Sequence, residues 1–259
     1  MKNKKKIGLT LLSAFLISGC TNANDETAPI KDSTQSDYVS SPTTSETKIS
    51  NNTTIDTESV ESENYQYYPL PDGTLAIAVG TNTYLPYLTI PKMHHGKMVT
   101  QITENGFANC IELKQINLPD SINVIREKAF SGCSSLDSIK IPDGTYVIGN
   151  YAFEGCSSLT SIVIPEGVTS IGYNAFSGCS SLTNVVIPKG VTSIGKYAFK
   201  GCSSLTSVVI PDNVTSIGES AFEGCSSLTI YCAAEKQPEG WDYWWNSDCP
   251  VVWGYKSKP

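Results

Sequence analysis

The chain has 259 residues, a formal net charge of −7 and 40% hydrophobic residues, which is enough for one or two folded domains. The acidic balance argues against a nucleic-acid partner, because a phosphate backbone requires a basic surface and no basic patch is found.

The first nineteen residues are typical of an export signal. Four lysines fall among the first six residues, and the apolar stretch "IGLTLLSAFLI" that follows is too short for a comfortable membrane span. The next letters, "ISGC", end at Cys20 and resemble the lipobox of bacterial lipoproteins. The resemblance implies cleavage after residues 1–19, a diacylglyceryl group on the Cys20 sulfur, and exposure outside the cytoplasm on the bacterial cell membrane. An ordinary signal peptide with an accidental cysteine is the alternative.

Residues 20–64 are expected to form a disordered tether. The segment is rich in Ser, Thr, Asn and acidic residues and has almost nothing to bury, so it cannot offset the entropy of ordering. Flexible chain of this length spans roughly 35–40 Å on average, enough to lift a domain away from the membrane.

Residues 65–102 are expected to form an N-terminal β cap. The stretch "DGTLAIAVGTNTYLPYLTIP" alternates apolar and polar residues around turn signals, which is typical of short paired strands.

Residues 103–231 repeat with a period of 23. The same three residue types return in register: cysteines at 110, 133, 156, 179, 202 and 225, phenylalanines at 107, 130, 153, 176, 199 and 222, and prolines at 119, 142, 165, 188 and 211. A fixed period of this length indicates a solenoid in which each repeat is one coil. One coil alone should not fold, so only the stacked array with capped ends is stable.

The repeat "LTSIVIPEGVTSIGYNAFSGCSS" at 159–181 can be interpreted residue by residue. A short parallel strand ends at Pro165, which lacks an N–H, and Gly167 is expected to turn the chain with a positive φ. A short helical or second-strand segment follows and is stopped by Gly178. The residues expected to point inward are Leu159, Ile162, Ile164, Val168, Ile171, Ala175, Phe176 and Cys179.

The cysteine of each coil is interpreted first as a small buried apolar side chain. A ladder of such residues would have rungs about 4.8 Å apart. Disulfides between neighbouring rungs are less favoured because stacked parallel side chains rarely present the required geometry. Metal binding is also less favoured, because no CxxC pair accompanies the ladder.

Residues 232–259 are expected to form an aromatic C-terminal cap. The cluster of Trp241, Tyr243, Trp244 and Trp245 either closes the open core or offers a platform on which sugars could stack. Cys232 and Cys249 fall outside the 23-residue ladder and could pair as a disulfide in an exported protein.

The repeats resemble the BspA-like leucine-rich repeat family of bacterial surface proteins. The resemblance covers about residues 67–256 and rests on "CSSLTSIVIPEGVTSIGYNAF" and its copies, on "LTIPKMHHGKMVTQI" at 88–102, and on "CAAEKQPEGWDYWWNSDCPVVWGYK" at the end. It implies a leucine-rich-repeat-like solenoid with a strand along one edge of each coil. It also implies adhesion to an extracellular protein or glycan, without naming that partner.

A binding face is predicted from the outward strand positions, which form two adjacent columns. The candidate residues are Ser138, Lys140, Ser161, Val163, Asn184, Val186, Ser207 and Val209. The exposed valines would give a narrow apolar stripe beside hydroxyl and amide groups, suited to an extended polypeptide or a glycan. The alternative is that valine simply favours strands.

No catalytic, cofactor or metal site is predicted. The histidines, His94 and His95, are adjacent on a polar turn and are interpreted as loop residues, with a metal or base role as the alternative. The acidic residues sit mostly at solvated turns, and no known phosphate-binding glycine loop is found. The sequence thus favours a non-catalytic adhesin-like protein over a cell-envelope hydrolase, a carbohydrate-binding module or a passive spacer.

Overall fold

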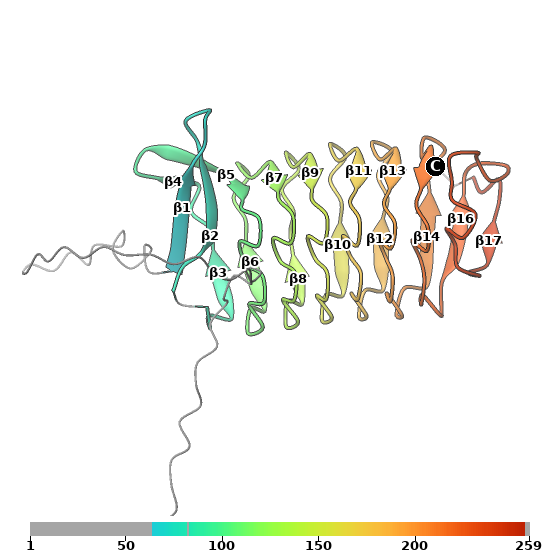
Figure 1. Ribbon diagram of the computed structural model, residues 1–259, viewed down its shortest axis with the longest axis horizontal. Helices are drawn as coiled ribbons and strands as arrows, with labels where there is room; N and C mark the ends of the chain where they lie inside the picture. The colour runs from blue at the N-terminus through green and yellow to red at the C-terminus, as the bar shows by residue number, and fades with distance from the viewer. Residues whose placement is uncertain (1–63, 82, 257–259) are drawn as a thin grey trace, which may run out of the picture. The chain divides into compact units, whose positions relative to one another are not determined.

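The computed structural model describes residues 64–81 and 83–256. The expected signal peptide, Cys20 and nearly all of the expected tether lie outside these residues. Within the described part, no helix is long and apolar enough to cross a membrane. The regular elements found there are all short β-strands, which stack coil upon coil into a solenoid, as predicted (Figure 1).

Each coil contributes strands to two sides of the solenoid. One side carries β1 (Tyr65–Pro69), β2 (Leu75–Val79), β5 (Lys97–Ile102), β7 (Val124–Ile125), β9 (Val147–Ile148), β11 (Ser170–Ile171), β13 (Ser193–Ile194) and β15 (Ser216–Ile217), in that order. β1 and β2 are antiparallel, and the later members pair in parallel. β4 (Met93–His94) forms an antiparallel pair with β5.

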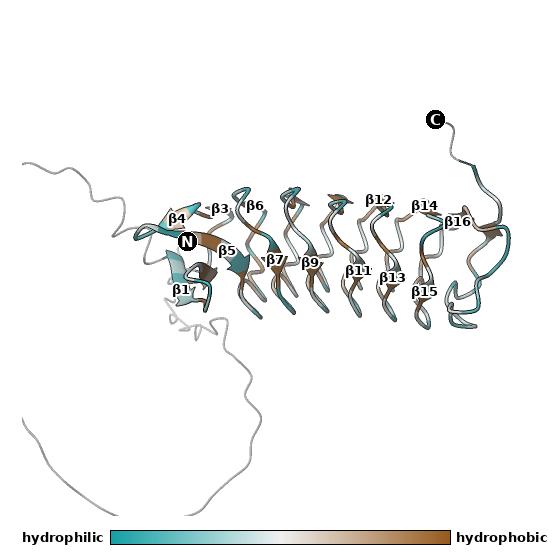
Figure 2. Ribbon diagram, turned by 90° about the horizontal axis from the view of Figure 1, so that it is seen from above, coloured by the Kyte–Doolittle hydropathy of each residue, from teal (hydrophilic) through white to brown (hydrophobic). Residues whose placement is uncertain are grey.

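The second side carries the five strands predicted before the repeat prolines, together with one earlier strand and two later ones. They form two sheets: β3 (Tyr87–Thr89), β6 (Gln115–Asn117) and β8 (Ser138–Ile139), then β10 (Ser161–Val163), β12 (Asn184–Val186), β14 (Ser207–Ile210), β16 (Thr229–Cys232) and β17 (Val251–Val252). All of these strands pair in parallel. Figure 2 shows hydrophobic strand segments returning at every coil, separated by more hydrophilic turns.

The core is the stack of inward columns that the repeat predicts. All eight residues expected to point inward from coil 159–181 are buried, with exposed fractions of 0–3%. The phenylalanine column is a continuous file, in which neighbouring ring centroids lie 5.4–5.5 Å apart and ring planes differ by 2–13°. Because each of the four interior rings is stacked between two others, the core holds the coils at one spacing.

The segment between the second strand and the cysteine contains no helix. It consists of consecutive turns. Of the two expectations for each coil, a helical segment or a second strand, only the second strand is present among the described residues. The reason is that backbone N–H groups of this segment donate to the next coil: Phe153 N–H bonds to Ala175 O at 2.8 Å and Gly155 N–H to Ser177 O at 2.7 Å. Donors committed between coils are not available for the i→i−4 bonds of a helix.

The sequence predicts a positive φ at two repeated positions, those of Gly167 and Gly178. Only the position of Gly178 has one. Gly178 has φ +75° and Asn109, in the same column, has φ +58°, as predicted. The expectation for Gly167 is wrong, because neither it nor Asn213 in its column has a positive φ. Close approach between coils favours glycine there instead: a Cβ at Gly190, the next copy, would clash with the carbonyl oxygen of Glu166.

Replacing Gly178 by alanine should lower the free energy of unfolding by about 1–2 kcal/mol, because an L-residue with a Cβ is strained at this φ. A Cβ there would meet Gly155 only at 3.5 Å, so the cost is conformational and not steric. The matched variant Gly178→Asn should lose less, since Asn109 already occupies this column. Urea denaturation of the three proteins measures the order, and an asparagine variant less stable than the alanine variant would contradict it.

Candidate functional site

The predicted binding residues lie on one exposed side of the solenoid. Parallel pairing places Ser161 beside Asn184 and Asn184 beside Ser207, and it places Val163 beside Val186. The residues between them along each strand, such as Ile162 and Val185, point inward and are buried. All eight predicted residues are exposed, although Ser138 and Lys140 belong to the coil of β8, whose strand lies in a separate sheet from β10. We call this surface the strand face.

The three valines of the strand face differ in exposure. Val163 is 71% exposed, Val186 55% and Val209 39%. Exposure falls toward the C-terminal end of the column, where Val209 lies beside Tyr231 on the next strand. The Tyr231 ring lies 4.9 Å from the Tyr255 ring, so two aromatic side chains stand next to Val209.

A groove of about 620 Å³ occupies this end of the strand face. Its floor is formed by β12 and β14, including Asn184, Val186, Ser207 and Val209, and its remaining walls by Lys189, Pro211, Asp212, Ala233, Tyr255 and Lys256. We call it the C-terminal groove. A smaller hollow of about 230 Å³ lies over β6 and β8 and includes Ser138, Lys140 and Ser161.

Four polar or charged residues of the C-terminal groove were missed in the sequence: Lys189, Asp212, Tyr255 and Lys256. Lys189 carried a signal, because the equivalent position of the other coils holds Asp120, Asp143, Glu166 and Asp212. Tyr255 and Lys256 carried none, since the last segment lies outside the period of 23. Backbone bonds bring them to the groove, with Tyr255 N–H donating to Cys232 O at 2.9 Å.

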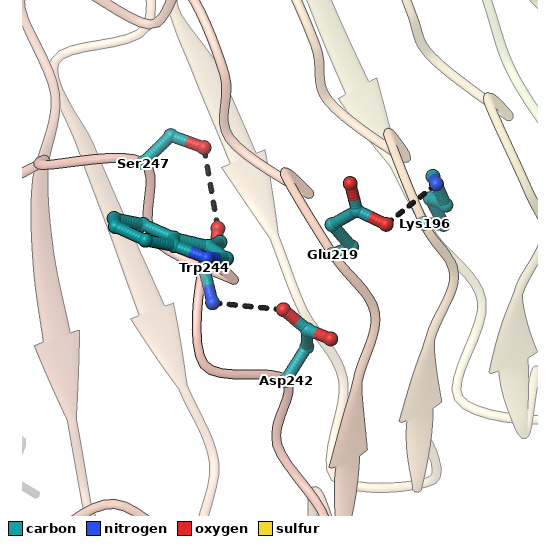
Figure 3. A network of polar contacts seen from close by, with 5 residues as sticks. All are labelled: Lys196, Glu219, Asp242, Trp244 and Ser247. Atoms are coloured by element: carbon teal, nitrogen blue, oxygen red, sulfur yellow. Dashed lines mark hydrogen bonds and ion pairs between the residues drawn. The ribbon is translucent and has the colours of Figure 1, made fainter.

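The lysines of the solenoid fall into two groups. Those on the turn segments between the second strand and the cysteine are paired: Lys196 lies 2.6 Å from Glu219 (Figure 3), and Lys200 lies 3.1 Å from Glu223. The Glu219 carboxylate accepts a hydrogen bond from Lys196 and raises the pKa of that lysine. By contrast, Lys189 and Lys256 take part in no ion pair among the described residues.

The predicted aromatic platform is divided by the fold. Trp241 and Trp245 are buried, and the Trp241 indole N–H donates to Val214 O at 3.0 Å, so these two close the core and cannot receive a sugar. Tyr243 and Trp244 remain 78% and 59% exposed. Their turn is fixed by Trp244 N–H donating to Asp242 Oδ1 at 2.8 Å and by Ser247 Oγ donating to Trp244 O at 3.3 Å (Figure 3).

Cys232 and Cys249 are both buried free thiols, and the structure does not bring them together. β16 and β17 pair with Ile230 opposite Val251, so Cys232 lies two residues beyond this pair and Cys249 two before it. An offset of four residues is about 13 Å along a strand, whereas a disulfide needs Cα atoms within about 7 Å. Cys249 instead continues the ladder, with its Sγ 3.6 Å from Cys225 O.

The cysteine ladder is a row of buried thiols, as the favoured interpretation expects. The ladder thiols from Cys133 to Cys225 each donate to a phenylalanine carbonyl of the preceding coil, such as Cys156 to Phe130 O and Cys179 to Phe153 O, both at 3.2 Å. The described cysteines are all free. Burial raises the pKa of Cys179 to about 12 and also raises the pKa of Cys156.

These raised pKa values predict alkaline destabilisation. In the unfolded chain the thiols ionise near their ordinary pKa of 9.0, whereas in the folded chain Cys179 keeps its proton up to about pH 12. Above pH 9 the unfolded state therefore binds fewer protons, and stability falls as pH rises, by up to about 1.4 kcal/mol per pH unit for each thiol. Urea denaturation at pH 8 to 11 should show a shallower slope for the double variant Cys156→Ala, Cys179→Ala. Equal slopes would contradict the assignment, since the two proteins differ only at these two cysteines.

The two histidines take part in ring contacts near the N-terminal end of the solenoid. The His94 ring stacks on Tyr67 with centroids 3.7 Å apart, and its other ring neighbour is His95. In the described part of the chain no group of three or more His, Cys, Asp or Glu residues is placed to hold a metal ion.

Comparison with known proteins agrees with this architecture. The profile described as "BspA type Leucine rich repeat region" matches residues 81–231 in six copies. The chain is similar to the crystal structure of a T. pallidum leucine-rich repeat protein, with 34% identity, a TM-score of 0.64, and coverage of 69% of this chain and 82% of that one. The comparison with curated proteins gave no match.

Two further solved structures share the fold. A leucine-rich repeat protein from Eubacterium ventriosum is 23% identical with a TM-score of 0.56, and the match covers 76% of this chain and 52% of that one. The pneumococcal vaccine antigen PcpA is 17% identical with a TM-score of 0.53, and the match covers 74% of this chain and 48% of that one. This chain thus spans about half the length of these two proteins.

Proposed function

The chain belongs to the BspA-type leucine-rich repeat family, and on that premise we propose that it is a non-catalytic, lipid-anchored surface protein that binds an extracellular protein or glycan through its strand face. The observation that carries this proposal is the strand face itself. Three valines stand exposed in one column beside a column of hydroxyl and amide groups, and the face is hollowed at two places. The proteins to which the chain is similar are repeat proteins and not members of enzyme families.

The proposed anchor rests on the sequence around Cys20. A thioether-linked diacylglyceryl group supplies two acyl chains, which hold a protein on a membrane where one chain gives only reversible binding. The acidic segment before residue 65 would then carry the solenoid outward from the membrane. Expressed in a bacterium with lipoprotein processing, the full chain should take up labelled palmitate and partition into detergent, and Cys20→Ser should do neither. Equal labelling of the two proteins would contradict the proposed lipid anchor at Cys20.

The binding role is tested with the full chain on arrays of extracellular matrix proteins and glycans. We expect saturable binding that is lost or weakened at least tenfold in the double variant Val163→Asn, Val186→Asn. Asparagine is tolerated in this column, because Asn117 already occupies it. The matched control is Ser170→Asn on β11, which lies on the other side of the solenoid. Absence of saturable binding, or equal loss in both variants, would contradict the proposal and leave a passive spacer as the better account.

A carbohydrate-binding role for the cap is the second candidate, favoured by the exposure of Tyr243 and Trp244. Their rings meet edge to face at 88°, so a sugar ring could stack on only one of them at a time. If this candidate is right, Trp244→Ala should abolish binding to glycans while the two valine replacements leave it unchanged.

A further inference from the structure

The residues that line the C-terminal groove limit the chemical class of partner that the strand face can bind. This inference rests on the proposed function. Its floor is apolar where Val186 and Val209 stand exposed, and the Tyr255 ring adds a wall at one end. Asn184 and Ser207 line the same floor two residues earlier along each strand and offer hydrogen-bonding groups. A ligand that fits must present apolar groups to one column and polar groups to the other.

The lining of the groove carries more positive than negative charge. Lys189 and Lys256 line it, both exposed and without an ion-pair partner among the described residues, and Asp212 is the one acidic residue in its lining. The chain as a whole carries −7, and the lysines of the turn segments already have glutamate partners, so this local excess of positive charge stands out. An anionic group on the ligand would complement it.

The apolar floor separates an acidic polypeptide from an acidic glycan. Branched aliphatic side chains gain free energy by covering other apolar groups, and a polypeptide supplies such groups on alternate residues. A glycan presents mainly hydroxyl groups, which gain little from valine, and sugar-binding surfaces more often use aromatic rings. From the floor, the walls and the charge together, we infer that the C-terminal groove binds an extended acidic polypeptide segment in which aliphatic residues alternate with carboxylates.

The test measures binding of labelled eight-residue peptides to the full chain by fluorescence anisotropy. A peptide alternating Val and Glu is expected to bind saturably, and its affinity should fall as salt is raised from 50 to 500 mM because exposed charges are screened. A peptide alternating Val and Gln should bind at least tenfold more weakly. An oligogalacturonate of similar length provides the acidic glycan.

The variant that decides the matter is Lys189→Glu with Lys256→Glu, expected to weaken binding of the acidic peptide at least tenfold. The first change is compatible with the fold, since Glu166 occupies the same position one coil earlier. The matched control Lys114→Glu reverses an exposed charge on an earlier coil outside the groove and should leave binding unchanged.

Equal affinity for the acidic and neutral peptides, or no effect of the double lysine variant, would overturn the inference. Preference for the oligogalacturonate over the acidic peptide would overturn it in favour of a glycan. These failures are distinct from failure of the proposed function. If the arrays show binding that depends on Val163 and Val186 but not on the two lysines, the strand face binds a partner and only the acidic chemistry is wrong.

Discussion

Replacing Phe176 by alanine is expected to lower the free energy of unfolding by about 3–5 kcal/mol. The side chain is fully buried, and its ring lies between those of Phe153 and Phe199, with centroids 5.4 Å away on each side. Removing it leaves a cavity that the neighbouring rings cannot fill, because each is held by the next coil. Stability in a stacked array depends on the contacts between neighbouring coils, so the loss falls on two interfaces at once.

Urea denaturation of the full chain, followed by circular dichroism, measures this loss. The control is Val186→Ala, since that valine is 55% exposed and its replacement should change the free energy of unfolding by no more than about 0.5 kcal/mol. A loss below about 1 kcal/mol for Phe176→Ala would show that the phenylalanine file does not hold the coils together.

Most of the repeat region could be predicted from the sequence because its period is constant. A residue that returns every 23 positions occupies the same place in each coil, so interpreting one coil interprets them all. The eight inward residues of coil 159–181 are buried for this reason, and the parallel register of Ser161, Asn184 and Ser207 follows from the same spacing. The columns of the strand face could therefore be predicted from the sequence, whereas the two hollows in that face could not.

The predictions from the sequence are wrong where contacts between coils determine the backbone conformation. The place of Gly167 in a turn predicts a positive φ, but its φ is not positive, and at the next copy, Gly190, the preceding coil comes too close for a Cβ. Likewise, the helical alternative for the segment before Gly178 is wrong, because turns form there whose N–H donors bond to the neighbouring coil. A single coil considered alone contains no information about the distance to the next one.

The cap was harder to predict because its spacing changes by one residue. Cys249 follows Cys225 by 24 positions and still continues the thiol ladder, and Trp241 follows Ile217 by 24 and still pairs with it. The same shift places Asp248, with φ +68°, in the column of Gly224. The strands of this end shift the other way, with Ser207 opposite Thr229 and Ile230 opposite Val251, so no single period describes the last coil.

Deleting one complete repeat is expected to leave the fold intact, whereas deleting one residue more should destabilise it severely. Removing residues 162–184 joins Ser161 to Val185 and keeps every column in place, because Val185 is the equivalent of Ile162. Removing residues 162–185 joins Ser161 to Val186 instead. The buried position then receives Val186, Ile187 turns to solvent, and Pro188 moves into the inward position of Ile187, which is buried in the intact chain.

The shorter deletion should retain the β-sheet circular dichroism and a cooperative unfolding transition, because the array loses one interior coil and gains no new surface. The longer deletion should cost at least about 3 kcal/mol, from the exposed isoleucine and from a proline forced into an inward strand position. Since the two proteins differ by a single residue in length, composition cannot explain a difference between them. Similar unfolding midpoints for both would mean that the columns are not locked between coils, and the strand face would then lose the fixed spacing on which its proposed binding role depends.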